Sequence, residues 1–183
     1  MKRLNSYCKF EKVIIFENDD FIVINKPQNI STLNDRNSPI NILNLARSYY
    51  KNAKVCHRLD KNTSGILVIA KNDRFYRYFS ILLEKRSVIK TYHALVDGVQ
   101  NIVELELNKP ISTSSRRSKV DFQQGRPSET LVSTIEKYKK HSLLACIPFT
   151  GRMHQIRVHL SNYGLPIIGD QHYGGKDLFL SGI

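Results

Sequence analysis

The chain alternates short apolar runs with polar loops, a pattern typical of a compact protein that contains several strands. Two β-branched and aromatic runs within residues 12–26 are separated by Glu-Asn-Asp-Asp, and Pro27 follows the second run. This order predicts a β-hairpin that ends at Pro27, because proline cannot donate a ladder hydrogen bond. The apolar run at residues 66–70 predicts a buried strand.

Further strands are predicted in the second half of the chain. Residues 88–99 alternate their side chains in the manner of a strand with two different faces. Residues 130–138 and 142–148 are two apolar-rich runs separated by Lys-Lys-His. They predict a pair of neighbouring strands.

A helix is predicted over residues 40–50, where apolar side chains recur at helical spacing. Ser38 is the candidate N-cap residue, and Pro39 would occupy the first helical position. We expect the apolar face of this helix to pack into the core.

Two more helices are predicted, each with its own boundary signal. One begins after Asn72 or Asp73, either of which can cap it, and runs to about Lys85. The other follows a polar string at residues 150–160 and ends near Tyr163, with Gly164 at the C-cap position. The first of the two has an apolar stripe that we expect to be core, formed by Phe75, Tyr78, Phe79, Leu82 and Leu83.

Composition adds a strong charge imbalance to this picture of a globular protein. The 183 residues include 28 Lys and Arg against 16 Asp and Glu, a formal net charge of +12. Such an excess favours a polyanionic partner, although a merely basic protein would show it too. The chain has no run of about 18 apolar residues, so no transmembrane helix is predicted. Its N-terminus has no apolar core of the signal-peptide type.

The cysteines and histidines do not predict a disulfide framework or a metal site. Cys8, Cys56 and Cys146 are odd in number and far apart, which indicates buried thiols in a reducing cytosol. His154 and His159 do not have the spacing of the HExxH zinc motif.

A charged string that runs into the strand at residues 66–70 has the strongest chemical signal. Residues 57–65 read His-Arg-Leu-Asp-Lys-Asn-Thr-Ser-Gly, so Asp60 lies in a loop that a rigid sheet can hold. Arg58 and Lys61 favour its ionised form, and the following Thr and Ser can hydrogen-bond the loop backbone. The alternative is an aspartate that only caps a turn.

Three other polar stretches are candidates for binding or catalysis. Residues 90–98 read Lys-Thr-Tyr-His-Ala-Leu-Val-Asp-Gly and include Tyr92, which would otherwise be an ordinary strand tyrosine. Residues 150–160 read Thr-Gly-Arg-Met-His-Gln-Ile-Arg-Val-His-Leu. Residues 108–130 are poor in apolar side chains, and their basic residues can follow a phosphate backbone or form a solvated loop.

The strings HRLDxxTSG, KxYxALVxG and TGRxHQIRVHL, in this order, closely resemble the signature of the RluA-like pseudouridine synthases, enzymes that isomerise uridine to pseudouridine within RNA. The resemblance covers roughly residues 13–175. It implies an α+β fold of the pseudouridine synthase catalytic-domain type, a mixed, largely antiparallel central sheet with flanking helices. We expect one catalytic domain over residues 1–183, shortened at its C-terminus and without the extra N-terminal RNA-binding domain that many relatives carry.

The resemblance also implies roles for individual residues. Asp60 would be the catalytic carboxylate, through either a covalent adduct or a glycal intermediate. Tyr92 would stack on the target base and take part in proton transfer, and Arg157 would pair with Asp60. The substrate-binding residues would be Arg58, Arg152, His154, Gln155, Arg116, Arg117 and Lys119.

The predicted partner is a structured RNA, either ribosomal or transfer RNA, and the reaction needs no metal or cofactor. We expect a cytoplasmic monomer that does not associate with membranes. Two rival functions remain open at this point. One is a non-catalytic RNA-binding module or RNA chaperone, and the other is a metal-dependent hydrolase that uses the histidines.

Overall fold

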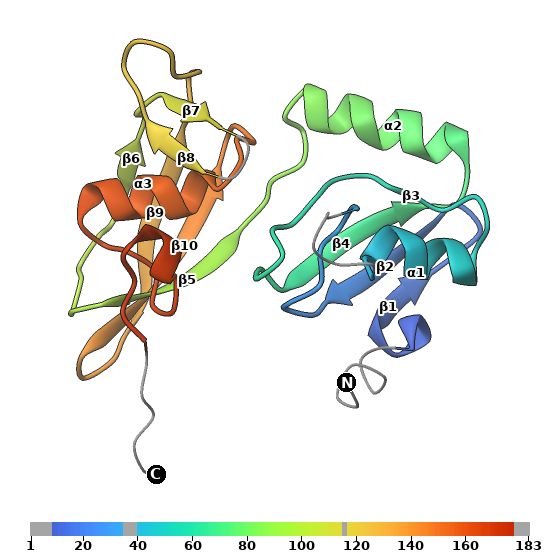
Figure 1. Cartoon of the computed structure of the whole chain (residues 1–183), viewed down its shortest axis with the longest axis horizontal. Helices are drawn as coiled ribbons and strands as arrows, with labels where there is room; N and C mark the ends of the chain where they lie inside the picture. Colours follow the sequence, from blue (N-terminus) through green and yellow to red (C-terminus); the bar gives the residue numbers. More distant parts are fainter. Residues whose placement is uncertain (1–8, 35–39, 115–116, 178–183) are drawn as a thin grey trace. The chain divides into compact units, whose positions relative to one another are not determined.

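The computed structural model describes residues 9–34, 40–114 and 117–177 (Figure 1). The chain forms two compact units, Met1–Ser87 and Val88–Ile183, here called the first and the second unit. Every strand ladder in the described residues is antiparallel, and helices accompany the sheets in both units. This confirms the predicted α+β class, with a four-stranded sheet in each unit.

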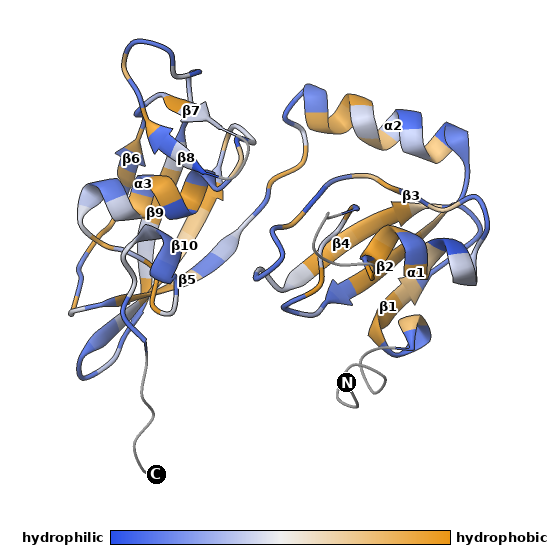
Figure 2. Cartoon of the chain, viewed as in Figure 1, coloured by the Kyte–Doolittle hydropathy of each residue, from blue (hydrophilic) through white to orange (hydrophobic). Residues whose placement is uncertain are grey.

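The described residues of the first unit form a sheet in the order β1-β2-β4-β3 and two α-helices. Its elements are η1 (Phe10–Val13), β1 (Ile14–Glu17), β2 (Phe21–Lys26), α1 (Ile42–Tyr49), β3 (Lys54–Val55), β4 (Gly65–Ala70) and α2 (Asp73–Glu84). The predicted hairpin is confirmed as β1 and β2, and the predicted buried strand is β4. Figure 2 shows these strands as mainly hydrophobic and the loops that join them as mainly hydrophilic.

Alternation along β2 and β4 builds the core of the first unit. Ile22 pairs with Ile69 and Ile24 with Leu67, and all four side chains are fully buried. Because side chains alternate along a strand, Lys26 lies on this same face of β2. The sheet therefore carries one basic side chain into an otherwise apolar face.

The two helices of the first unit differ from expectation at their ends and faces. Asn41, not Ser38, caps α1, since its side chain accepts a hydrogen bond of 2.9 Å from the N–H of Asn44. Ser38 lies outside the described residues. Asn72 caps α2 as predicted, but α2 has no fully buried residue, and Tyr78 is 57% exposed. The predicted apolar stripe of α2 is therefore only partly covered. The covered side of the helix includes Phe75, which stacks on an aromatic ring of β2.

Where the structure describes it, the second unit has a sheet in the order β5-β10-β9-β6, a separate β7–β8 hairpin and one α-helix. Its elements are β5 (Tyr92–Asp97), β6 (Leu105–Leu107), β7 (Ile111–Thr113), β8 (Ser118–Val120), β9 (Thr130–Lys137), β10 (His141–Pro148), α3 (Gln155–Tyr163) and η2 (Gln171–Tyr173). The predicted strand pair is confirmed as β9 and β10. The third predicted helix is α3, and Gly164 ends it at a φ of 91°.

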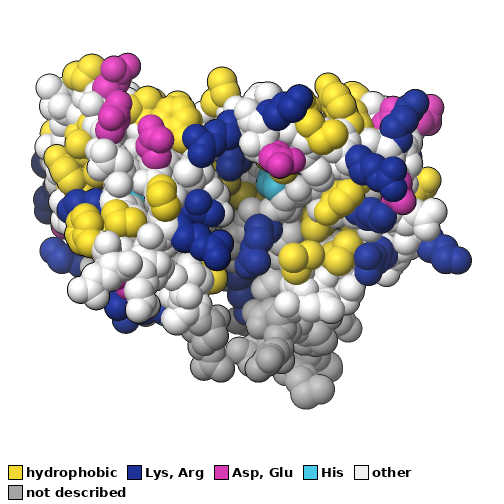
Figure 3. All heavy atoms as spheres, turned by 90° about the horizontal axis from the view of Figure 1, so that it is seen from above, with side chains coloured by type: hydrophobic (Ala, Val, Ile, Leu, Met, Phe, Trp, Pro, Cys, Tyr) yellow, Lys and Arg dark blue, Asp and Glu magenta, His cyan; other side chains and the backbone are white. Residues whose placement is uncertain are grey.

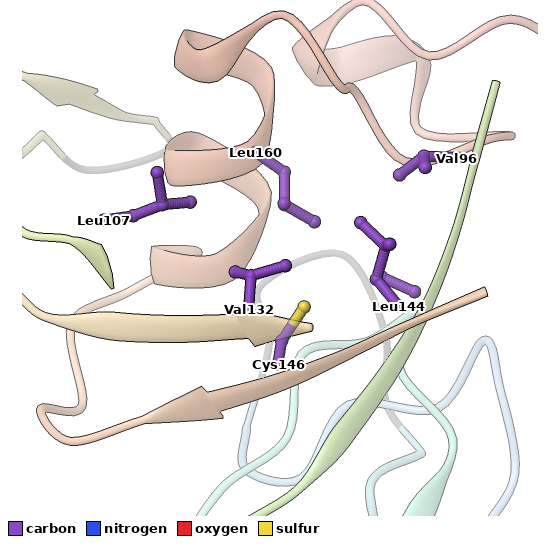
Figure 4. Packing of buried hydrophobic residues seen from close by; sticks show 7 residues of the cluster. Val96, Leu107, Val132, Leu144, Cys146 and Leu160 are labelled. Atoms are coloured by element: carbon purple, nitrogen blue, oxygen red, sulfur yellow. The ribbon is translucent and has the colours of Figure 1, made fainter. Parts of the chain in front are cut away.

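One apolar cluster connects the sheet of the second unit with α3 (Figure 4). Leu160 of α3 points toward β-strand side chains that include Val132 and Leu144, and all three are fully buried. Cys146 belongs to this cluster, and burial raises the pKa of its thiol to about 12. Burial likewise raises the pKa of Cys56 to about 11. Both thiols are therefore buried as predicted, while Cys8 lies outside the described residues.

None of the helices in the described ranges has the length and apolar character needed to cross a membrane.

Candidate functional site

Asp60 lies in the loop between β3 and β4, and the backbone on both sides of it is fixed by hydrogen bonds. The hydroxyl of Thr32 accepts the N–H of Leu59 at 3.1 Å and donates to the carbonyl of the same residue at 2.8 Å. The N–H of Thr63 donates to the carbonyl of Asp60 at 3.1 Å. Thr32 is only 3% exposed, so water competes little for these bonds. The Asp60 backbone is thus held in one conformation.

The buried Lys26 adds a positive charge to the base of this loop. Its ammonium group donates to the carbonyls of Pro27 and Ile30, both at 2.9 Å, and of Lys61 at 3.3 Å. Burial lowers the pKa of Lys26 to about 8, and the negative charge of Asp60 acts against this shift. The Lys26 ammonium and the Asp60 carboxylate therefore interact electrostatically inside the first unit.

The two residues that open the charged string have different environments. His57 accepts the N–H of Val68 at its Nε2 atom over 3.2 Å, and its ring stacks on Phe79. This histidine connects the loop with β4 and α2. Arg58 is exposed on the surface of the first unit, and its predicted contact with RNA stays a prediction.

Tyr92 begins β5 in the second unit, opposite Cys146 of β10. Its half-buried ring packs against the apolar cluster of Figure 4, which holds the side chain in a defined position. Its predicted role at the target base stays a prediction.

Arg157 makes a two-pronged ion pair with Asp170 in the second unit. Its Nε atom lies 2.7 Å from one carboxylate oxygen, and Nη2 lies 2.8 Å from the other. The two side chains are 19% and 12% exposed. The guanidinium also lies over the ring of Tyr173, 4.8 Å from its centroid. The predicted pairing of Arg157 with Asp60 stays a prediction.

Gln155 at the start of α3 uses all four hydrogen-bonding positions of its amide within the protein. The oxygen accepts from the Thr150 hydroxyl and the Arg152 N–H, while the nitrogen donates to the Glu129 carbonyl and the Thr130 hydroxyl. Because Gln155 is only 4% exposed, this network gives it a structural role. Its predicted contact with substrate stays a prediction.

Arg152 is tied to the turn before β9, since two of its guanidinium nitrogens donate to the Pro127 carbonyl at 3.2 and 3.3 Å. His154, two residues later, has a φ of 57° and a ψ of 22°. This left-handed conformation is uncommon for a residue other than glycine. The His154 Nδ1 atom lies 2.7 Å from the Tyr173 hydroxyl. The predicted contacts of Arg152 and His154 with substrate stay predictions.

His159 has its ring nitrogens bonded inside the second unit. Nε2 donates to the Lys109 carbonyl at 2.9 Å, and Nδ1 lies 3.0 Å from the Thr130 hydroxyl. Burial lowers the pKa of His159, which favours the neutral ring. Within the ranges that the structure describes, no group of three or more His, Cys, Asp or Glu side chains is arranged to hold a metal ion.

A cavity of about 410 Å³ lies beside the β7–β8 hairpin of the second unit. Arg117, Lys119 and Asn162 line it together with Ser118 and Tyr173. Arg117 and Lys119 are exposed, and Arg116 lies outside the described residues. On the face drawn in Figure 3, Lys and Arg side chains cover more of the surface than acidic side chains do. The cavity offers hydroxyl, amide and basic groups that suit a phosphate or sugar.

The sequence also matches a known protein family over most of its length. Residues 20–162 match the model of the family described as RNA pseudouridylate synthase. The chain belongs to this family. The resemblance of the three strings to pseudouridine synthases is thereby confirmed.

Several pseudouridine synthases are similar to the chain in sequence. It is 37% identical to ribosomal large subunit pseudouridine synthase C of Buchnera aphidicola subsp. Baizongia pistaciae, over 92% of the chain and 56% of that protein. It is 38% identical to the synthase C of Haemophilus influenzae, over 96% of the chain and 57% of that protein. The chain therefore spans somewhat more than half the length of these curated relatives.

Solved structures of pseudouridine synthases resemble the chain as well. Human RNA pseudouridylate synthase domain containing 1 matches with a TM-score of 0.74 and 28% identity, over 88% of this chain and 69% of that one. Human RNA pseudouridylate synthase domain containing 4 has the same TM-score at 24% identity, which supports the fold.

Three residues of this chain have structural partners that the sequence did not predict. Asp170 and Tyr173 hold Arg157, and Lys26 supports the Asp60 loop. A signal existed for Lys26, because it follows Ile22 and Ile24 at every second position of a predicted strand. That spacing places Lys26 on the buried face.

Proposed function

We propose that this chain isomerises uridine to pseudouridine in RNA, with Asp60 as the catalytic carboxylate. The observation that carries the proposal is the hydrogen-bonded loop of Asp60 in a member of the RNA pseudouridylate synthase family. A fixed loop favours catalysis, because a carboxylate that is held in place loses little entropy when it meets the substrate.

The reaction proposed for Asp60 changes the bonds of a single nucleoside. The bond between the ribose carbon and the ring nitrogen of uracil breaks, the base turns, and a new bond joins the same ribose carbon to a ring carbon. That ring carbon loses a proton, and the ring nitrogen gains one. Asp60 either attacks the ribose carbon or assists departure of the base by accepting a proton. Atoms and electrons balance, because substrate and product are isomers.

Tyr92 and Arg157 act in the same reaction. Tyr92 offers an aromatic face on which the target base stacks, an interaction that tolerates different neighbouring sequences. Arg157 supplies positive charge to anionic groups of the reaction, with pairing to Asp60 as the expected arrangement. The target uridine is stacked within RNA, so it must turn out of the stack before it reacts. Arg58 is suited to fill the space that the uridine leaves.

Ribosomal RNA is the better supported substrate, and transfer RNA is the alternative. The relatives quoted above are named for the ribosomal large subunit. The net charge of +12 favours binding to any RNA, and Arg117 and Lys119 at the rim of the cavity are suited to phosphate contacts. We expect the chain to act in the cytoplasm as a monomer.

The test is an in vitro assay with RNA that carries tritium at the uracil carbon to which the ribose is transferred. Wild-type protein should release tritium and form pseudouridine. The Asp60→Asn variant should bind RNA but release no tritium. Asp19→Asn is the matched control, because Asp19 is an exposed aspartate of the same unit. Ribosomal and transfer RNA are assayed separately.

Three results would contradict the proposal. Binding without tritium release by the wild-type protein would indicate an RNA-binding module. Conversion at the wild-type rate by Asp60→Asn would remove Asp60 from the chemistry. Cleavage of the RNA that stops in excess chelator would indicate a metal-dependent hydrolase instead.

A further inference from the structure

The segment of residues 169–174 connects α3 with the end of the described chain and has no part in the function proposed so far. Two of its side chains, Asp170 and Tyr173, converge on the polar string that opens α3. Their partners are Arg157 and His154, two of the candidate site residues.

Asp170 and Tyr173 fix the guanidinium of Arg157 from two directions. The carboxylate meets the edge of the guanidinium through two parallel hydrogen bonds of 2.7 and 2.8 Å. Such a fork sets the plane of the group as well as its position. The guanidinium carbon lies over the Tyr173 ring, 4.8 Å from its centroid, where a cation is attracted to the ring. The guanidinium is thus held both by the carboxylate fork and by the aromatic ring.

The hydroxyl of Tyr173 holds a second candidate residue. It accepts the N–H of Ser118 at 3.0 Å, which leaves its own proton available for the Nδ1 atom of His154 at 2.7 Å. Tyr173 is 7% exposed, so both contacts are shielded from water. His154 is in the left-handed conformation, and its ring is fixed at the side that faces Tyr173.

The segment that carries Asp170 and Tyr173 is itself well anchored. The carbonyl of Asp170 accepts the N–H groups of Tyr173 and Gly175 at 3.0 and 2.9 Å. The Ser161 hydroxyl of α3 donates to the Tyr173 carbonyl at 2.7 Å. A Cβ atom at position 175 would collide with the carbonyl oxygen of Ile167, so only glycine fits this close approach. A rigid segment can transmit its geometry to Arg157.

We propose that Asp170 and Tyr173 are positioning residues of the reaction, which hold Arg157 and His154 in the orientation that the substrate requires. This inference rests on the proposed function, because it assigns the two residues a role in uridine isomerisation. It predicts that their loss lowers the rate of the bound complex more than it lowers RNA affinity.

The experiment compares single-turnover rates at saturating RNA for wild type, Asp170→Asn and Tyr173→Phe. Asp170→Asn removes the charge of the fork, and Tyr173→Phe removes the hydroxyl but keeps the ring. Each should lower the rate by about 10- to 100-fold, because small misplacements of a reacting group have effects of this size. RNA affinity and the thermal unfolding midpoint are measured for each variant.

Matched controls and a double-mutant cycle separate positioning from general damage. Glu136→Gln and Tyr138→Phe make the same chemical changes at exposed positions of the second unit, and each should change the rate by less than about twofold. In an Arg157→Met background, Asp170→Asn should cost far less than it costs in wild type, because its partner is already gone.

Three results would overturn the inference. Wild-type rates in both Asp170→Asn and Tyr173→Phe would remove these residues from the reaction. Equal losses of rate in the presence and absence of Arg157 would show that Asp170 does not act through it. Variants that lose RNA affinity and folded structure in proportion to rate would indicate a structural role. A wild-type protein without isomerase activity contradicts the proposed function first, and the inference falls with it.

Discussion

The carboxylate of Asp60 acts on the buried ammonium group of Lys26 and opposes the effect of burial on its pKa. Burial lowers the pKa of Lys26 to about 8, and the charge of Asp60 raises it. The lysine also holds the loop of Asp60 through the Lys61 carbonyl, 3.3 Å from its nitrogen. A change in the charge at Asp60 should therefore change the pKa of Lys26.

Replacing Asp60 by Asn should lower the pKa of Lys26 below its value of about 8 in the unchanged protein, because the attraction of the carboxylate is lost while burial persists. An NMR titration that follows the side-chain nitrogen of Lys26 measures this directly. Asp19→Asn serves as the control and should leave the titration in place. An identical midpoint in Asp60→Asn would mean that the two charges are not coupled.

Lys26 should also make the stability of the protein depend on alkaline pH. Its pKa is about 8 in the folded protein against 10.5 as the ordinary value, so between these values the unfolded chain binds more protons. Stability therefore rises with pH through this window. Below it, Lys26 is charged in both states, and burial of the charge costs about 3 kcal/mol.

Urea unfolding of wild type and Lys26→Met, compared between about pH 7 and pH 10, isolates this contribution. The difference in unfolding free energy should shift in favour of wild type as the pH rises. Lys26→Met also leaves three carbonyls without their donor, so it is destabilising at every pH. A pH-independent difference would show that Lys26 keeps its ordinary pKa when buried.

Thr32→Val should release the loop of Asp60 with little change in side-chain volume. The N–H and the carbonyl of Leu59 would both lose their buried partner, at a cost of about 1–3 kcal/mol in unfolding free energy. Thr32→Ser keeps the hydroxyl and is the matched control. Hydrogen exchange at the Leu59 amide should accelerate in Thr32→Val only, and equal protection in the two variants would count against this bond.

RNA affinity should fall steeply with salt, because basic side chains release counterions from phosphates. Joint replacement of Arg116, Arg117 and Lys119 by Ala should flatten the slope of log affinity against log salt by about one for each phosphate that the protein no longer neutralises. The control removes the same charge from Lys137, Lys139 and Lys140 at the β9–β10 turn. If both triple variants flatten the slope equally, the hairpin has no special part in binding.

Local patterns predicted the elements whose determinants lie within a few residues of one another. The β9–β10 pair follows from two alternating runs around a short polar turn, and α3 ends where Gly164 adopts a positive φ. The N-cap residue predicted for α1 was wrong, because Ser38 and Asn41 are both good N-cap residues and only the fold decides between them.

Residues whose role depends on distant partners were not predictable in this way. Asp170 is an ordinary turn aspartate until folding brings it against Arg157, which lies on a different element. Alternation with Ile22 and Ile24 predicts that Lys26 is buried, but it does not predict the three carbonyls of two separate loops that accept from its nitrogen. The string around Asp60 could be recognised from the sequence, because its unusual residues are contiguous in the chain.

The left-handed backbone of His154 predicts opposite outcomes for selection on stability and selection on activity at one position. A histidine in this conformation is strained by about 1–2 kcal/mol relative to glycine, which adopts it freely. A saturation library at position 154 should therefore yield different residues when it is selected for heat resistance and when it is selected for activity. Heat resistance should enrich glycine and asparagine, whereas selection for pseudouridine formation should retain histidine, and enrichment of glycine under both selections would contradict a role of His154 in the reaction.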